Sequence, residues 1–276
     1  MTVAACLRKI AACPRKIARY LRKTSTTSAV LGLLAVLGLA VLGLAATASA
    51  APTFTFKVTA VPIPGFRGTG DILGAGAVLQ GEGTISGTEY GGSPPPLTGI
   101  DVFAPAGAKL HPQGFATCAP STIEQSGPTP CPKTSIAGPK GSATGVVSFG
   151  SERVEETASV QPFFAPGGGV EAFVDGTTPV SLEILAPGHF VDSSPPFGPE
   201  FIGEVPLIET VPGALDASFE RGTVRVGAAY KQGRKTISYI TIPKRCTNGG
   251  WPIKVQLSFY GGATAEASYT MPCPKR

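Results

Sequence analysis

Apolar and polar residues alternate along most of the chain after residue 50, which is the pattern of a half-buried β-strand. In the first such run, residues 53–60, Phe54, Phe56 and Val58 alternate with threonine and lysine. Similar runs follow at residues 76–86, 98–104, 143–149, 153–161, 169–175, 179–185, 201–209, 215–220, 222–230, 235–243, 252–260 and 264–271. The pattern predicts an all-β protein, an antiparallel β-sandwich or jelly roll.

The segments between these runs are rich in turn-forming residues, because the chain contains 36 Gly and 27 Pro. We therefore expect long Pro/Gly-rich loops. One short helical turn is expected in residues 119–127, where Pro120 can start a helix and Gly127 can end it. Residues 51–276 have the length of a single sandwich domain; the alternative is a split at the Pro-rich stretch 193–199.

The N-terminal 50 residues have the features of an export signal. A basic stretch precedes the uncharged run 29–46, and Ala48 and Ala50 occupy the −3 and −1 positions of a cleavage site. The alternative is an uncleaved membrane anchor, since eighteen helical residues span about 27 Å. The membrane is expected to be contacted only through residues 29–46, and the protein is expected outside the cell or at its surface.

The net charge of +5 arises from the N-terminal segment, which holds seven basic and no acidic residues. Removing it leaves 16 basic against 18 acidic residues in residues 51–276. A nucleic-acid-binding domain carries a basic surface on its folded part. We therefore expect no nucleic-acid partner.

Four cysteines lie in the exported part, and in an oxidising compartment they form two disulfides. Three pairings are possible, and the local one is favoured: Cys118 with Cys131 and Cys246 with Cys273. A zinc site is disfavoured because neither pair has the C-x₂₋₄-C spacing of zinc ligands.

Five segments together form a sequence signature: residues 105–118, Gly127-Pro128, residues 131–138, residues 177–180 and the segment from Cys246 to Cys273. Over about residues 97–273 the chain resembles a group of uncharacterised exported proteins of actinobacteria. The resemblance implies a secreted β-rich domain. It implies no activity, cofactor or catalytic residue.

Two groups of residues could carry hydrolase chemistry. One combines three hydrolase residue types within five positions: His189, Asp192 and Ser193. The other is the densest carboxylate group: Glu152, Glu155 and Glu156. The first is better explained as a polar loop, since triads are defined by three-dimensional geometry. The second is better explained as solubilising charge, since neighbours on a strand point to opposite faces.

No catalytic, cofactor-binding or metal-binding residue is therefore assigned from the sequence, and no cofactor is expected. Two hypotheses remain. The favoured one is a non-enzymatic interaction or structural module with an envelope or extracellular partner. The alternative is a hydrolase that acts on an envelope carbohydrate or ester.

The last two runs predict a hairpin with a three-residue loop at residues 261–263. Trp251 shares its strand face with apolar residues and is expected in the core, whereas Tyr260 has the opposite parity and is expected at the surface. The register that matches apolar to apolar residues has the pairs Phe259–Ala265, Leu257–Ala267, Val255–Tyr269, Ile253–Met271 and Trp251–Cys273.

We predict that the exported protein begins at Ala51, because signal peptidases cleave after small residues at −3 and −1. The intact mass of the secreted protein measures this. A membrane-bound species that retains residues 1–50 would show that the segment is an anchor.

Overall fold

The computed structural model describes residues 51–63, 73–149, 152–179, 181–207, 209, 217–247 and 249–273. The expected export signal, with its apolar run 29–46, lies outside these residues. Residues 49–276 form one compact unit. Among the described residues, no helix is long and apolar enough to cross a membrane.

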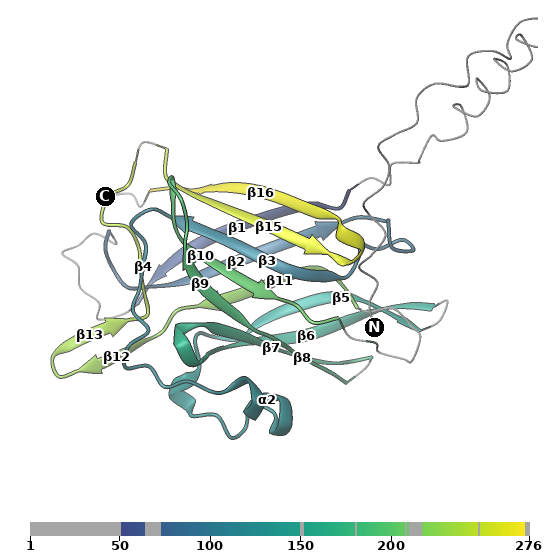
Figure 1. The fold of residues 1–276 in the computed structure, drawn as a ribbon, viewed down its shortest axis with the longest axis horizontal. Coiled ribbons are helices and arrows are strands. Elements are labelled where there is room, and N and C mark those ends of the chain that lie inside the picture. The colour runs from purple at the N-terminus through teal and green to yellow at the C-terminus, as the bar shows by residue number, and fades with distance from the viewer. Residues whose placement is uncertain are drawn as a thin grey trace, which may run out of the picture. The chain divides into compact units, whose positions relative to one another are not determined.

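The fold is all-β, as the alternating pattern predicts, and its two large sheets are antiparallel (Figure 1). The seven-stranded sheet has the order β1 (Thr53–Pro62), β2 (Ala77–Ser86), β11 (Ser218–Val226), β5 (Gly141–Phe149), β6 (Glu152–Phe164), β7 (Val170–Thr178) and β8 (Leu182–Ala186). The five-stranded sheet has the order β16 (Thr264–Met271), β15 (Trp251–Phe259), β3 (Leu97–Pro105), β10 (Phe197–Glu204) and β9 (Gly188–Asp192).

Two small ribbons complete the described strands. β12 (Ala229–Gln232) pairs with β13 (Lys235–Ser238), and this hairpin projects from one end of the unit (Figure 1). β14 (Ile240–Thr241) pairs with β4 (Lys109–Leu110). The Pro-rich stretch 193–199 contains the turn between β9 and β10, which are neighbours in one sheet.

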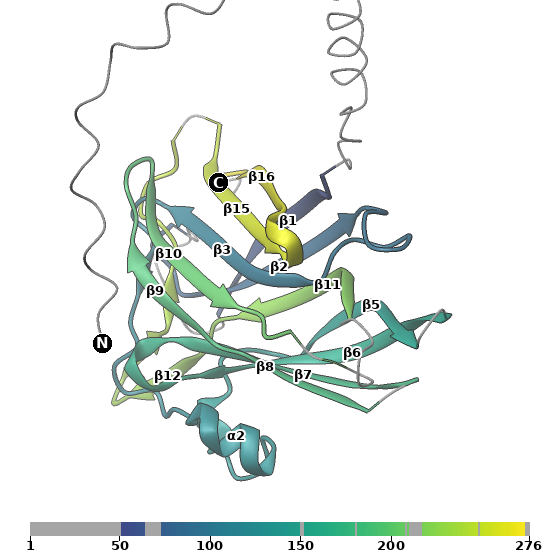
Figure 2. The same ribbon diagram turned by 45° about the vertical axis from the view of Figure 1, so that its right-hand side comes forward.

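The two large sheets face each other across a hydrophobic core (Figure 2). Alternate residues of each strand point into this core, as period-two alternation requires. At one end Ile85 of β2 packs with Leu97, Val255 and Leu257 of the five-stranded sheet. A second cluster is formed by Ala77, Ile242, Trp251, Ile253 and Met271. A third, largely aromatic, contains Phe164 and Tyr239, with Phe115, Phe190 and Phe201 against them.

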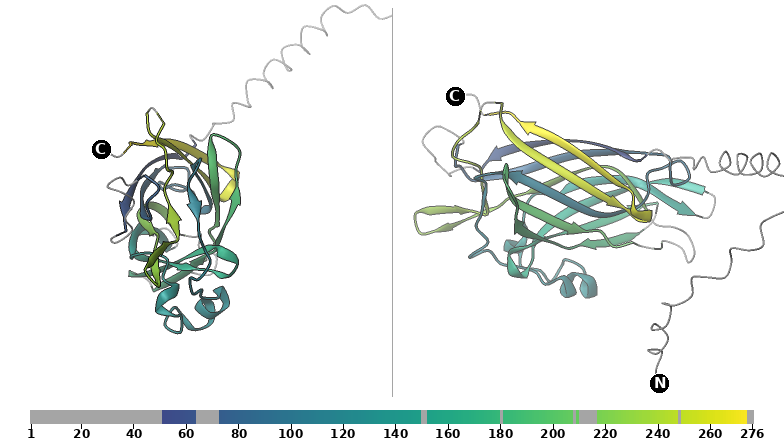
Figure 3. Two further views of the ribbon diagram at one scale, coloured as in Figure 1. Left: turned by 90° about the vertical axis from the view of Figure 1, so that its left-hand side faces the viewer. Right: turned by 45° about the horizontal axis from the view of Figure 1, so that its top comes forward.

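One short helix, α2 (Pro120–Ser126), lies outside the strands, on the outer side of β7 and β8 (Figures 2 and 3). The helical turn expected in residues 119–127 is therefore present. Pro120 occupies the first turn, and the Gly127 N–H donates to the Ile123 carbonyl over 2.8 Å. Gly127 has φ +67°, which favours glycine after the last helical residue.

The predicted hairpin register is wrong by two residues, although its faces are right. Leu257 pairs with Ala265, Ile253 with Tyr269 and Trp251 with Met271. The Phe259 N–H donates to the Ala263 carbonyl over 2.9 Å, so the loop is residues 260–262, the 3-10 turn η3 (Tyr260–Gly262). Gly261 and Gly262 both have positive φ, which lets the chain turn one residue earlier than predicted. Apolar residues still face apolar residues because a shift of two keeps the face.

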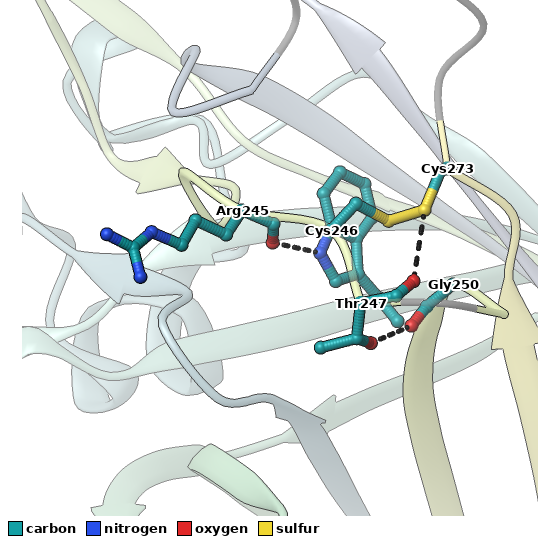
Figure 4. The surroundings of a disulfide bond; sticks show 6 residues. Arg245, Cys246, Thr247, Gly250 and Cys273 are labelled. Carbon is teal, nitrogen blue, oxygen red and sulfur yellow. Dashed lines mark hydrogen bonds between the residues drawn. A yellow bond between two sulfur atoms is a disulfide. The ribbon is translucent and has the colours of Figure 1, made fainter.

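Trp251 is a core residue, as its strand parity predicts, with 3% of its surface exposed. Its indole N–H donates to the Arg245 carbonyl over 2.9 Å, so the polar edge of the buried ring is satisfied. The Cys246–Cys273 disulfide links the segment before β15 to the segment after β16. It lies beside Thr247 and Gly250 (Figure 4). Tyr260 is 46% exposed, also as predicted.

We expect Trp251→Ala to lower the free energy of unfolding by about 3–5 kcal/mol, because it opens a cavity in the core. The matched control is Tyr260→Ala, which removes an exposed ring and should change stability by less than about 0.5 kcal/mol. Urea unfolding of both variants measures this. Equal stability of Trp251→Ala and wild type would contradict the core assignment.

Candidate functional site

The three hydrolase residue types at 189–193 do not come together. His189 and Asp192 lie on β9, not in a loop as expected, and an odd spacing of three places them on opposite faces of the strand. Ser193 lies in the turn after β9, where its N–H donates to the Gly198 carbonyl over 2.9 Å. This segment therefore has no triad geometry.

Asp192 does share a cavity with the other histidine. A cavity of about 460 Å³ is lined by His111 and Asp192, together with Lys109 and Phe190. The His111 Nε2 atom lies 3.2 Å from the Thr241 hydroxyl of neighbouring β14. Because His111 directly follows β4, which pairs with β14, this hydrogen bond joins adjacent strand ends.

The carboxylates of β6 are divided between the two faces of the strand, as neighbours on a strand must be. Glu155 is exposed and lies 3.9 Å from Arg221. Glu156 is only 5% exposed, and its Oε1 atom accepts a hydrogen bond from the Thr178 N–H over 3.0 Å. The interpretation as solubilising charge is therefore wrong for Glu156, which is a buried structural acceptor for the β7 backbone.

A better candidate site is built by residues 118–137, which we call the stapled loop. The Cys118–Cys131 disulfide closes it, with a Cα–Cα distance of 5.4 Å. Both ends are fastened to β6: the Cys118 N–H donates to the Phe164 carbonyl and the Ala137 N–H to the Pro162 carbonyl, each over 2.9 Å. The loop is thus a lid whose two ends are attached to one strand.

Beneath the stapled loop lies an apolar cluster on the outer face of the seven-stranded sheet. Phe163 and Phe164 are consecutive on β6, so they point to opposite faces. Phe164 enters the core, whereas Phe163 joins Phe173 of β7 under the loop. Ile123 of α2 belongs to the same cluster, with 1% of its surface exposed. The lid is held down by burial of these apolar side chains.

A groove of about 260 Å³ runs along one side of the lid, over the outer face of β6 and β7. Its floor is formed by Phe163 and Phe173, and the stapled loop contributes Pro132 and Ile136 to its wall. Ile136 is 37% exposed, so part of its apolar side chain is open to a partner. The groove can therefore take an apolar group from a partner.

The rim of this groove carries charge. Lys133 and Lys140 line one part of it, and Asp175 of β7 lines another. Among the residues that the structure describes, neither lysine makes an ion pair. Two unpaired ammonium groups beside an apolar floor favour a partner with negative charge next to an apolar group.

One acidic residue lies under the lid. Glu171 follows the parity of Phe173 and Asp175 on β7, and its surface is 0% exposed. Neither carboxyl oxygen has a hydrogen-bond partner within the described part of the chain. Burial, with a smaller contribution from the charge of Glu124, raises the pKa of Glu171 from its ordinary value of 4.5 to about 7. Sequence analysis missed this residue, because strand alternation alone does not show which outer faces a loop covers.

The structure joins Cys118 to Cys131 and Cys246 to Cys273, which is the pairing that the sequence favours. All four sulfur atoms are therefore bonded to sulfur, and none is a thiolate that could hold zinc. In the described ranges no group of three or more His, Cys, Asp or Glu residues could hold a metal ion.

Comparison of the chain with family models, with curated proteins and with solved structures finds no match.

We expect the double substitution Cys118→Ala and Cys131→Ala to lower the free energy of unfolding by about 2–4 kcal/mol, because the lid loses its loop closure. Urea unfolding measures this, with the Cys246–Cys273 bridge intact as an internal reference. Peptide mapping without reductant should recover the two local pairs. Crossed pairs would contradict the assignment.

Proposed function

We propose that the protein is a secreted or cell-surface interaction module without catalytic activity, and that the groove beside the stapled loop is its binding site. The partner is an acidic segment of an envelope or extracellular protein that presents an apolar side chain. That side chain enters the groove, and neighbouring carboxylates lie near Lys133 and Lys140.

One observation carries this proposal: the partly exposed side chain of Ile136 lines the same groove as Phe163 and Phe173, and Lys133 and Lys140 line it too without an ion pair among the described residues. Apolar lining with a few charged groups at the rim is typical of peptide-binding sites. The disulfide and the fastened loop ends limit the entropy that the site loses on binding.

The proposed location outside the cell is supported by the chemistry of the chain. Two disulfides are typical of an oxidising compartment. The export signal in residues 1–50 and the resemblance to exported actinobacterial proteins favour the same location. Whether residues 29–46 remain as an anchor does not alter the proposed binding site.

The alternative function is hydrolysis of an envelope carbohydrate or ester. The observation that favours it is the cavity shared by His111 and Asp192. The hydrogen bond between the His111 ring and the Thr241 hydroxyl supports a structural role for this histidine instead.

We expect purified residues 51–276 to bind the protein components of a cell-envelope preparation and to release no sugar or acid from it. Retention should weaken with added salt, because Lys133 and Lys140 face the partner. Loss of retention after protease treatment of the fraction would support a protein partner. Released sugar or acid would support the hydrolase instead, and retention by protein-free glycan would contradict the proposed partner.

We expect Ile136→Ser to weaken retention about tenfold or more, because an aliphatic contact of about 1.5–3 kcal/mol is lost. Tyr260→Ser is the matched control: its ring is also large and exposed, but it lies on the β15–β16 turn and does not line the groove. Binding isotherms on the protein fraction measure both variants. Equal loss in the two variants would show that the groove is not the site.

A further inference from the structure

Glu171 is the most unusual acidic residue in the described part of the chain. It is completely buried, and both of its carboxyl oxygens are without a hydrogen-bond partner. Buried polar groups are almost always hydrogen-bonded, and an unpaired buried charge is strongly destabilising. An arrangement of this kind is therefore more stable with the carboxyl group neutral than with it ionised.

The surroundings of Glu171 offer no positive charge to balance it. On β6 its cross-strand partner is Phe163. On β8 the nearest residue of the same face is Leu185, which packs with Phe173. The one charged group that acts on Glu171 is Glu124 of α2, which is exposed and of the same sign. Each element packed against Glu171 therefore favours its neutral form.

We propose that Glu171 is a proton-controlled latch for the stapled loop: α2 stays closed over β6 and β7 while Glu171 is protonated, and lifts when Glu171 loses its proton. Lifting α2 lets water reach the carboxylate and increases its distance from Glu124. The ends of the loop stay fastened to β6, so the motion is a local opening and not unfolding of the sheet.

The sign of the pH dependence follows from linkage. The closed loop holds Glu171 at a pKa of about 7, and the open loop returns it to its ordinary value of 4.5. The closed state therefore binds more protons than the open state between these two values. Closure is most stable below about pH 4.5, weakens as the pH rises from about 4.5 to about 7, and reaches a constant lower stability above that range.

The latch bears on the proposed binding site, and this part of the inference rests on the proposed function. Phe163 and Phe173 belong both to the cluster beneath α2 and to the floor of the groove. Opening of α2 removes Ile123 from the two rings and enlarges the apolar floor. The affinity for the partner is therefore expected to differ between pH 5.5 and pH 8.

Two measurements on purified residues 51–276, without any partner, test the latch. Hydrogen exchange of the α2 amides, corrected for intrinsic rates, should increase about tenfold or more from pH 5.5 to pH 8. Over the same range, a phosphine should reduce Cys118–Cys131 faster relative to Cys246–Cys273, which is an internal reference for the pH dependence of the reductant. Unchanged exchange and an unchanged ratio would overturn the proposal.

Three substitutions locate the effect. Glu171→Gln keeps the shape but cannot ionise, so exchange of α2 should not depend on pH. Glu124→Gln removes the neighbouring surface charge, so the increase in α2 hydrogen exchange between pH 5.5 and pH 8 should be smaller than in wild type. This variant provides the test if Glu171→Gln does not fold. Glu183→Gln, an exposed change on β8, is the matched control and should behave as wild type. A pH dependence that persists in Glu171→Gln would overturn the latch.

Retention on the envelope protein fraction at the two pH values separates the two proposals. If α2 opens in a Glu171-dependent way but the protein does not bind the envelope proteins, the result supports the latch and contradicts the proposed function. Retention without pH-dependent opening supports the function and overturns the latch.

Discussion

The adjoining ends of β6 and β7 are buried on both faces, and the rest of the candidate site depends on this constraint. On the inner side Phe164 and Val170 belong to the aromatic core, and on the outer side Phe163 and Phe173 lie under the stapled loop. A sheet in which only one face is buried needs no cover. Here the outer apolar residues would face water without the loop, so the loop and the sheet stabilise each other.

The two disulfides have different roles because they lie in different surroundings. Cys246–Cys273 ties the chain on either side of the β15–β16 hairpin, beside the buried ring of Trp251. Cys118–Cys131 closes a lid that holds an unbalanced carboxyl group beneath it. The first strengthens a hairpin that is already well packed. The second closes a loop that covers outer residues of β6 and β7.

Much of the fold could be predicted from the sequence, because strand alternation, helix-terminating residues and cysteine spacing are local signals. The core position of Trp251 and the helix between Pro120 and Gly127 follow from them. Features that depend on distant segments could not be predicted. The burial of Glu171 requires a loop from residues 118–137, and the early turn at Tyr260 involves a hydrogen bond from its N–H to the Pro96 carbonyl, 2.8 Å long. The groove is missed for the same reason, since its floor and wall come from separate parts of the chain.

The order of the strands has a consequence for how the molecule assembles. β11, from residues 218–226, lies between β2 and β5, and β15 lies between β16 and β3. As the chain emerges from its N-terminal end, the β1–β2 ribbon and the β5–β8 meander remain separate parts of the seven-stranded sheet until β11 arrives and joins them, and β3 gains β15 as a neighbour later still. Each piece exposes unpaired strand edges during that interval. The half-made protein is therefore at greatest risk of aggregation shortly before the last quarter of the chain is available.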